Sequence, residues 1–122
     1  MKRTLPVGEV PCWAYRRGLD PLEREVGPER LYDMRLLVSE LVTNCIRHAR
    51  STEGDELELE VSVTGDLIHV CVTDDGPGFE ASSRGPEDDP GSGWGLFLVE
   101  QLSDRWGVDV NGRTQVWFEI RR

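Results

Sequence analysis

Hydrophobic and polar residues alternate at every second position in two stretches of the chain. Leu57–Val63 has the sequence LELEVSV and Leu67–Thr73 has LIHVCVT, with turn residues at 64–66 between them. Strict alternation predicts half-buried strands, so these stretches predict a β-hairpin. A second hairpin is predicted where WGVDV and TQVWFEI flank Asn111 and Gly112, because Asn-Gly suits the positive φ angles of a type I′ turn.

Three other segments repeat their hydrophobic residues at three- and four-residue steps, which predicts helices. The first, Val10–Val26, is expected to be helical in part and bent near Gly18 and Pro21. The second begins at Pro28, since proline is favoured in the first helical turn. Its buried stripe is predicted to contain Leu31, Met34, Val38, Leu41 and Cys45. The third covers residues 94–105, with three residues turned inward: Leu96, Val99 and Leu102.

The order of these elements is helices, hairpin, helix, hairpin. It predicts an α+β fold, a two-layer α/β sandwich in which helices pack on one face of a mixed, mostly antiparallel sheet. A length of 122 residues is that of one domain, so residues 1–122 are expected to form a single domain.

One long stretch, Gly76–Gly93, has the composition of a surface loop. It contains five glycines and three prolines, and its apolar side chains are limited to Phe79 and Ala81. Loops of this length inside a compact domain are often functional, and a lid over a site is predicted at about residues 79–92.

Composition and charge exclude several classes of function. The chain is 38% hydrophobic and 30% charged, which is typical of a folded, soluble protein. Its net charge of -9, without a basic cluster along the sequence, argues against binding nucleic acid directly. It has no apolar run long enough for membrane insertion, and no signal peptide is recognised at its start. Three widely spaced cysteines are expected to be reduced thiols of a cytoplasmic protein.

Three polar residues of the second predicted helix fall on one stripe beside its buried stripe. On a helical wheel Asn44 and Arg47 lie within about 40° of Glu40, and His48 lies at the border with the buried stripe. A solvated helix face is the alternative interpretation of this stripe.

Two glycine-containing segments accompany the polar stripe. In VTDDGPGF, Asp74 ends a predicted strand, and Gly76 and Gly78 would let a flat ligand approach the backbone, although an acidic turn would have the same sequence. In GSGWGL, glycines lead directly into a helix, where backbone N–H groups can bind an anion. That segment is neither a Walker A loop nor a Rossmann fingerprint. A purine acceptor, a metal-binding stripe and a phosphate cradle together predict a nucleotide site.

These segments resemble the motifs of the GHKL superfamily of ATPases and kinases, which share the Bergerat nucleotide-binding fold and its histidine-kinase-like ATPase domain. SELVTNCIRHA resembles the N box, DDGPGF and GSGWGL the two glycine boxes, and GRTQVWFEI the last box. The resemblance covers roughly Met34 to the end of the chain. Within the superfamily the chain is most similar to the RsbW-type anti-sigma-factor serine kinases and to stand-alone actinobacterial ATP-binding regulators.

The resemblance implies a role for each matching position. Asn44 would bind Mg²⁺, Glu40 would orient or deprotonate the attacking hydroxyl of the substrate, and Asp74 would accept a hydrogen bond from adenine. Gly76 and Gly78 would lie beside the base; Gly91, Gly93, Gly95 and Leu96 would give N–H groups to the phosphates; Thr114 would support Asp74 or bind adenine through water.

Three further positions border the implied site. Arg47 would contact phosphate or the lid, and Trp94 would pack on the lid or the nucleotide. For Trp94 core packing is the equal alternative, and for His48 a structural histidine is the alternative.

The resulting hypothesis is a regulatory protein that binds ATP and Mg²⁺. It would act as an anti-sigma-type serine/threonine kinase that phosphorylates or sequesters a protein partner, such as a sigma factor or its antagonist, and it could form a homodimer. The alternative is a non-catalytic module in which ATP sets the lid and hence the affinity for a partner. A two-component histidine kinase is disfavoured because no dimerisation helix with a phospho-accepting histidine is recognised. A DNA-topology or chaperone ATPase would need further domains.

Overall fold

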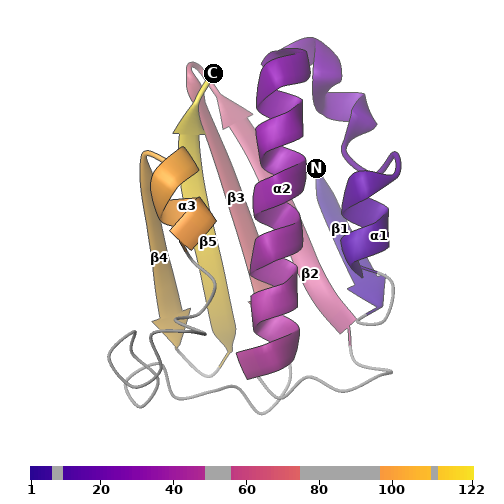
Figure 1. Ribbon diagram of the computed structural model, residues 1–122, viewed down its shortest axis with the longest axis vertical. Coiled ribbons are helices and arrows are strands. Elements are labelled where there is room, and N and C mark those ends of the chain that lie inside the picture. Colours follow the sequence, from indigo (N-terminus) through magenta and orange to yellow (C-terminus); the bar gives the residue numbers. More distant parts are fainter. Residues whose placement is uncertain (7–9, 49–55, 75–96, 111–112) are drawn as a thin grey trace.

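The structure is a computed structural model of the chain, shown in Figure 1. It describes residues 1–6, 10–48, 56–74, 97–110 and 113–122, and within these it describes the side chains of all but residues 10–11, 44–48, 97 and 110.

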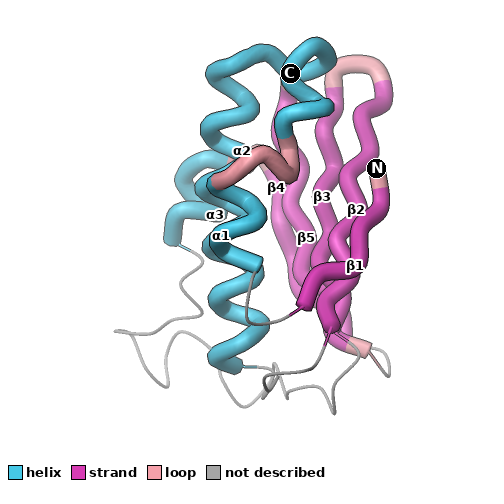
Figure 2. The backbone as a smooth tube through the Cα atoms, turned by 90° about the vertical axis from the view of Figure 1, so that its right-hand side faces the viewer, coloured by secondary structure: helices cyan, strands magenta, loops and turns pink. Residues whose placement is uncertain are grey.

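The described strands form one five-stranded sheet in the order β1-β2-β3-β5-β4, and each neighbouring pair is antiparallel. The strands are β1 (Lys2–Pro6), β2 (Glu56–Thr64), β3 (Leu67–Asp74), β4 (Arg105–Val110) and β5 (Thr114–Arg121). The helical elements are α1 (Val10–Tyr15), the 3-10 turn η2 (Asp20–Leu22), α2 (Glu23–His48) and α3 (Phe97–Leu102). Figure 2 shows the helices in one layer and the strands in the other. The predicted two-layer α+β fold is therefore confirmed.

Alternation along the strands decides which side chains reach the core. Inward positions of β3 and β5 are at most 2% exposed: Ile68, Val70, Val72, Val116, Phe118 and Ile120. Helix α2 covers them with side chains that are not exposed at all: Met34, Leu37, Val38, Leu41 and Val42. Burial of this apolar layer between helix and sheet is the main stabilising contribution to the fold.

Helix α2 contains a break that marks its effective start. Gly27 has φ 83° and ψ 161°, which is outside the helical region, so the long regular helix begins at Pro28 as the sequence predicts. The preceding segment is tied to it by an ion pair between Asp20 of η2 and Arg35 of α2. The predicted bend between Gly18 and Pro21 is also confirmed, since α1 ends at Tyr15 and η2 begins at Asp20.

Two expectations about elements were incomplete or wrong. Strand β1 is not predicted by any sequence pattern, because it places few hydrophobic residues inward; it lies at the sheet edge, where Pro6 is tolerated. The third helix ends at Leu102 and does not reach Arg105. It stops because Asp104 joins the sheet: its N–H donates to the carbonyl of Glu119 (2.8 Å), and its carboxylate accepts from the N–H of Arg121 (2.8 Å).

Among the described residues, no helix combines the length and the apolar character needed to cross a membrane.

Candidate functional site

The described ends of the predicted motifs lie at one end of the molecule. Figure 1 shows the C-terminal end of α2, the C-terminal end of β3 and the N-terminal end of β5 at the bottom of the view. The antiparallel pairing of β3 with β5 explains part of this arrangement, because the last residue of one strand must then face the first residue of the other. Segments that are separate in sequence therefore supply one site.

Asp74 and Thr114 form the central polar pair at this end. They are direct partners in the β3–β5 register, and both are 0% exposed. Asp74 follows Ile68, Val70 and Val72 in the alternation, so its carboxylate is on the helix side of the sheet. A carboxylate and a hydroxyl are thus held side by side at the end of an otherwise apolar layer.

The hydroxyl of Thr114 is unsatisfied within the described protein. Its Oγ1 is buried and has no hydrogen-bond partner among the described protein atoms. A buried, unsatisfied hydroxyl costs about 1–3 kcal/mol, so such atoms are rare in folded proteins. A donor or acceptor on a bound molecule, or a water beside it, would satisfy Thr114, and purine nitrogens provide such groups.

Glu40 is the described member of the predicted polar stripe. Its side chain is half-buried on α2, between the buried Ser39 and Leu41. Asn44, Arg47 and His48 continue α2 toward the site end, but their side chains lie outside the described part of the structure.

The family model described as "Histidine kinase-like ATPase domain" matches residues 13–120. The chain belongs to this family. Within it, the chain is similar to curated proteins named "Serine-protein kinase RsbW". That of Listeria monocytogenes serotype 4a (strain HCC23) is 34% identical over 88 residues, covering 62% of this chain and 56% of that protein. That of Oceanobacillus iheyensis is 30% identical over 97 residues, covering 70% and 60%. The chain thus spans little more than half the length of these relatives.

Solved structures support the same fold. The catalytic domain of the histidine kinase ThkA matches with a TM-score of 0.60 at 14% identity, over 99% of this chain and 95% of that one. The Acinetobacter baumannii histidine kinase AdeS matches with a TM-score of 0.56 at 14% identity, over 99% and 67%. These matches confirm the Bergerat fold that the sequence motifs implied. The chain is a member of the GHKL superfamily and is similar to RsbW.

Many of the predicted site residues of this ATPase domain fall outside the described residues. They include both glycine segments and the predicted lid at residues 79–92: Gly76, Gly78, Gly91, Gly93, Trp94, Gly95 and Leu96. Their roles stay predictions.

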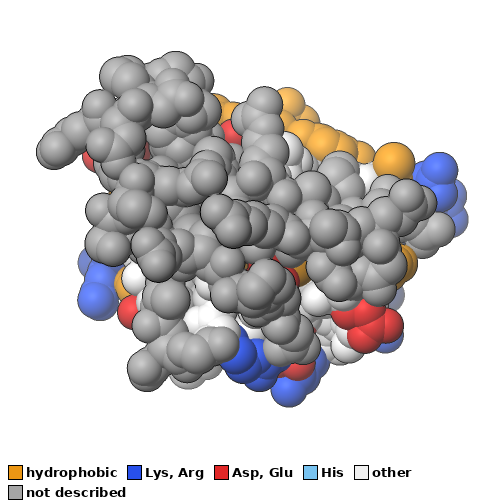
Figure 3. Space-filling view, turned by 90° about the horizontal axis from the view of Figure 1, so that it is seen from below, with side chains coloured by type: hydrophobic (Ala, Val, Ile, Leu, Met, Phe, Trp, Pro, Cys, Tyr) orange, Lys and Arg blue, Asp and Glu red, His pale blue; other side chains and the backbone are white. Residues whose placement is uncertain are grey.

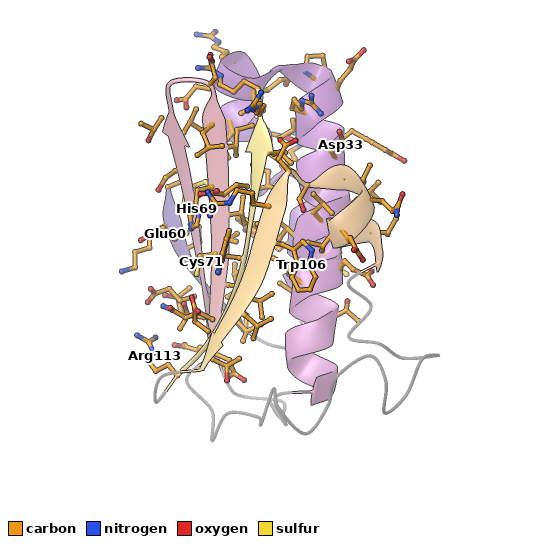
Figure 4. All side chains as sticks on the ribbon, turned by 90° about the vertical axis from the view of Figure 1, so that its left-hand side faces the viewer. Asp33, Glu60, His69, Cys71, Trp106 and Arg113 are labelled. Carbon is orange, nitrogen blue, oxygen red and sulfur yellow. The ribbon has the colours of Figure 1, made fainter. Side chains whose placement is uncertain are left out.

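Two charged features of this end were not anticipated. Arg113 directly precedes Thr114 and lies at the same end of the sheet, as Figure 4 shows. Figure 3 views the molecule from this end, and described side chains of both charges appear around the grey residues.

Among the described residues, no group of three or more His, Cys, Asp or Glu side chains could hold a metal ion. An asparagine oxygen, as predicted for Asn44, is compatible with Mg²⁺, which takes few protein ligands and keeps several waters.

Proposed function

We propose that the chain binds ATP with Mg²⁺ and acts as a regulatory serine/threonine protein kinase of the anti-sigma type, which phosphorylates or sequesters a protein partner. The observation that carries this proposal is the buried Asp74 carboxylate beside the unpartnered Thr114 hydroxyl, at the end where α2 finishes. Family membership and similarity to RsbW proteins support it.

Asp74 and Thr114 would recognise the base. The exocyclic amine of adenine is a donor, so it would pair with the Asp74 carboxylate, which is acceptor-only when ionised. The Thr114 hydroxyl would complete the contact directly or through a water. Gly76 and Gly78 would let the ring approach the backbone. Guanine presents a carbonyl at the corresponding position, so the pair would select adenine.

The triphosphate would extend from the base toward the end of α2. The Asn44 side-chain oxygen would hold Mg²⁺, which bridges phosphate oxygens and neutralises their charge when bound. Backbone N–H groups of residues 91, 93, 95 and 96 would bind the phosphates, and Arg47 would add a cation. His48 and Trp94 would border this part of the site.

Glu40 would act on the substrate hydroxyl. It lies one helical turn before Asn44, so its carboxylate would be near the terminal phosphate. It would orient or take the proton of the attacking serine or threonine hydroxyl. Burial on one side excludes part of the surrounding water and strengthens this interaction.

The partner is proposed to be a protein in the cytoplasm, such as a sigma factor or its antagonist. A homodimer is compatible with this role. The sequence similarity extends over part of each RsbW protein, so partner binding is proposed by analogy.

Phosphoryl transfer from radiolabelled ATP to candidate antagonist proteins, encoded beside this chain, tests the proposal. Wild type is expected to label one of them in the presence of Mg²⁺. Glu40→Ala should lower the transfer rate by about 10²–10⁴-fold, the usual contribution of a general base, while nucleotide binding is kept. Asp74→Asn should lose both binding and transfer.

A control at the opposite end of α2, Arg24→Gln, should behave as wild type. If no candidate is labelled, but partner binding depends on ATP and survives in Glu40→Ala, the non-catalytic module replaces the kinase. If ATP affects neither transfer nor partner binding, the proposed function is wrong.

A further inference from the structure

A cavity lies away from the Asp74 end, between the edge strand β1 and the segment that contains α1. Its volume is about 590 Å³, within the range of small-molecule sites. Its described lining residues are Arg3, Cys12, Trp13, Arg16, Arg17, Gly18 and Pro21. Figures 1 and 2 show α1 on the helix side of the sheet, over the edge formed by β1.

Three arginines line this cavity, and none of its described lining residues is acidic. Arg3 comes from β1, where it pairs with Leu59 and so faces the helix side. Arg16 and Arg17 follow α1 directly. Two separate parts of the chain therefore contribute exposed arginines to the lining of one cavity.

None of these three arginines makes an ion pair with a described residue. Four other described cations do have acidic partners: Lys2 with Glu58, Arg30 with Asp33, Arg35 with Asp20, and Arg105 with Glu119. The chain carries a net charge of -9, so acids are abundant. Asp20, the acid closest in sequence to Pro21 of the cavity, is already paired with Arg35. The cavity is thus a local positive site on an acidic protein.

The remaining wall is apolar and shaped by Trp13. A Cβ added at Gly18 would overlap the indole ring of Trp13, so the ring lies directly against the glycine backbone. A larger residue at position 18 would displace the ring. The cavity is therefore lined by apolar residues (Trp13, Pro21 and Cys12) as well as by arginines.

We infer that this cavity is a binding site for a small phosphomonoester, with Arg3, Arg16 and Arg17 around the phosphate and Trp13 against the rest of the ligand. Guanidinium groups bind phosphate through paired, charge-assisted hydrogen bonds. Three cations match the charge of a phosphate dianion better than that of one carboxylate. The volume fits a small molecule, and the apolar wall favours one with a hydrophobic body. The site is independent of the proposed nucleotide site, from which it differs in every lining residue.

Phenyl phosphate, titrated without Mg²⁺ while the four tryptophan indole N–H signals are followed by NMR, tests the inference. The Trp13 signal, assigned with Trp13→Phe, should shift and saturate. Inorganic phosphate should bind more weakly, because it lacks the apolar body, and benzoate at least tenfold more weakly than phenyl phosphate. Arg16→Gln/Arg17→Gln should weaken phenyl phosphate binding at least tenfold. Arg24→Gln, which removes an exposed arginine outside the cavity, should not change it.

The melting temperature of each variant is also measured with and without ATP and Mg²⁺, and the difference is its nucleotide response. An unchanged nucleotide response in Arg16→Gln/Arg17→Gln would show that the fold and the nucleotide site are intact, so this test is separate from that of the proposed function. An unmoved Trp13 signal, equal effects of phenyl phosphate and chloride at matched ionic strength, or equal binding by the double variant would overturn the site. Binding of a phosphoserine peptide at least tenfold more tightly than phenyl phosphate would overturn the small-molecule assignment in favour of a phosphoprotein.

Discussion

At the scale of single residues, the pairing of Asp74 with Thr114 carries the functional interpretation. Both side chains are fully buried, yet the Thr114 hydroxyl lacks a partner among the described protein atoms. Thr73, which precedes Asp74 on β3 and lies on the opposite face of the sheet, contrasts with Thr114. Its hydroxyl accepts a hydrogen bond from Nε2 of Gln115 (3.5 Å) and lies near the sulfur of Cys71 (3.9 Å). One threonine is satisfied by the fold, and the other is unsatisfied at the proposed nucleotide site.

Replacing Thr114 by valine should separate these roles. In the absence of nucleotide, Thr114→Val should leave the free energy of unfolding unchanged or raise it by up to about 1 kcal/mol, because an unsatisfied polar group is removed. The dissociation constant for ATP should rise by about two- to tenfold, the value of one hydrogen bond. Urea unfolding and calorimetric titration measure both.

The matched control is Thr73→Val, which removes a satisfied hydroxyl. It should lower the free energy of unfolding by about 1 kcal/mol and leave ATP affinity unchanged. If Thr114→Val lowers the free energy of unfolding by more than Thr73→Val does, the assignment is wrong.

Cys71 illustrates how the environment of one residue sets its reactivity. Burial raises the pKa of its thiol, and the charges of Glu60, Asp109 and Glu58 raise the pKa further, while a hydrogen bond with Thr73 opposes them. Because the thiolate is the reactive form, a raised pKa lowers the reactive fraction at a given pH. Iodoacetamide at pH 8 should therefore modify Cys71 several times more slowly than the exposed Cys12. Peptide mass spectrometry gives both rates. In urea they should converge, and a faster reaction at Cys71 in the folded protein would show the opposite shift.

At the scale of elements, α2 joins the core to the site. Its apolar stripe fixes the helix on the sheet, and its last described turn reaches the end where Asp74 lies. The start of the regular helix depends on Gly27, whose φ of 83° and ψ of 161° belong to a region occupied almost only by glycine. A Cβ at this position would have no atom within 4 Å, so the requirement comes from the backbone alone.

Gly27→Ala should therefore lower the free energy of unfolding by about 1–3 kcal/mol, with no packing defect to repair. Gly65→Asn is the control, because Gly65 has φ 58° in the β2–β3 turn, where asparagine is tolerated. It should cost less than about 1 kcal/mol. Urea unfolding measures the free energy of unfolding of both variants. Equal decreases would mean that the backbone at position 27 relaxes to a helical angle.

At the scale of the whole molecule, the proposed nucleotide would connect both layers of the fold. Asp74 and Thr114 belong to the sheet, whereas Glu40 and Asn44 belong to the helix layer. A ligand that binds both layers in the folded state, and neither in the unfolded chain, stabilises the fold by mass action.

A thermal shift with ATP and Mg²⁺ measures this coupling. At about 100 times the dissociation constant, wild type should gain roughly 2.7 kcal/mol. Asn44→Ala should lose the magnesium-dependent part of the gain, and Asp74→Asn should lose most of it. ADP should reproduce the base-dependent part in wild type. No response to any nucleotide in wild type would contradict the proposed site.

The sequence by itself determined the elements that depend on local periodicity. Alternation in LELEVSV and LIHVCVT fixed the β2–β3 hairpin and put Asp74 on a strand end, and the three- and four-residue repeat fixed the buried stripe of α2. These patterns are local because strands and helices present their side chains at fixed intervals. The motif order also indicated the GHKL family, which the family model confirms.

Only the tertiary structure decided which distant residues meet. The edge strand β1 exists through its pairing with β2, and Thr114 faces Asp74, forty residues earlier, through the β3–β5 register. Arg3 likewise lines one cavity with Arg16 and Arg17 because the chain turns back after β1 and places α1 over it. Register and layer packing minimise the free energy of the whole chain at once, so no local pattern specifies them.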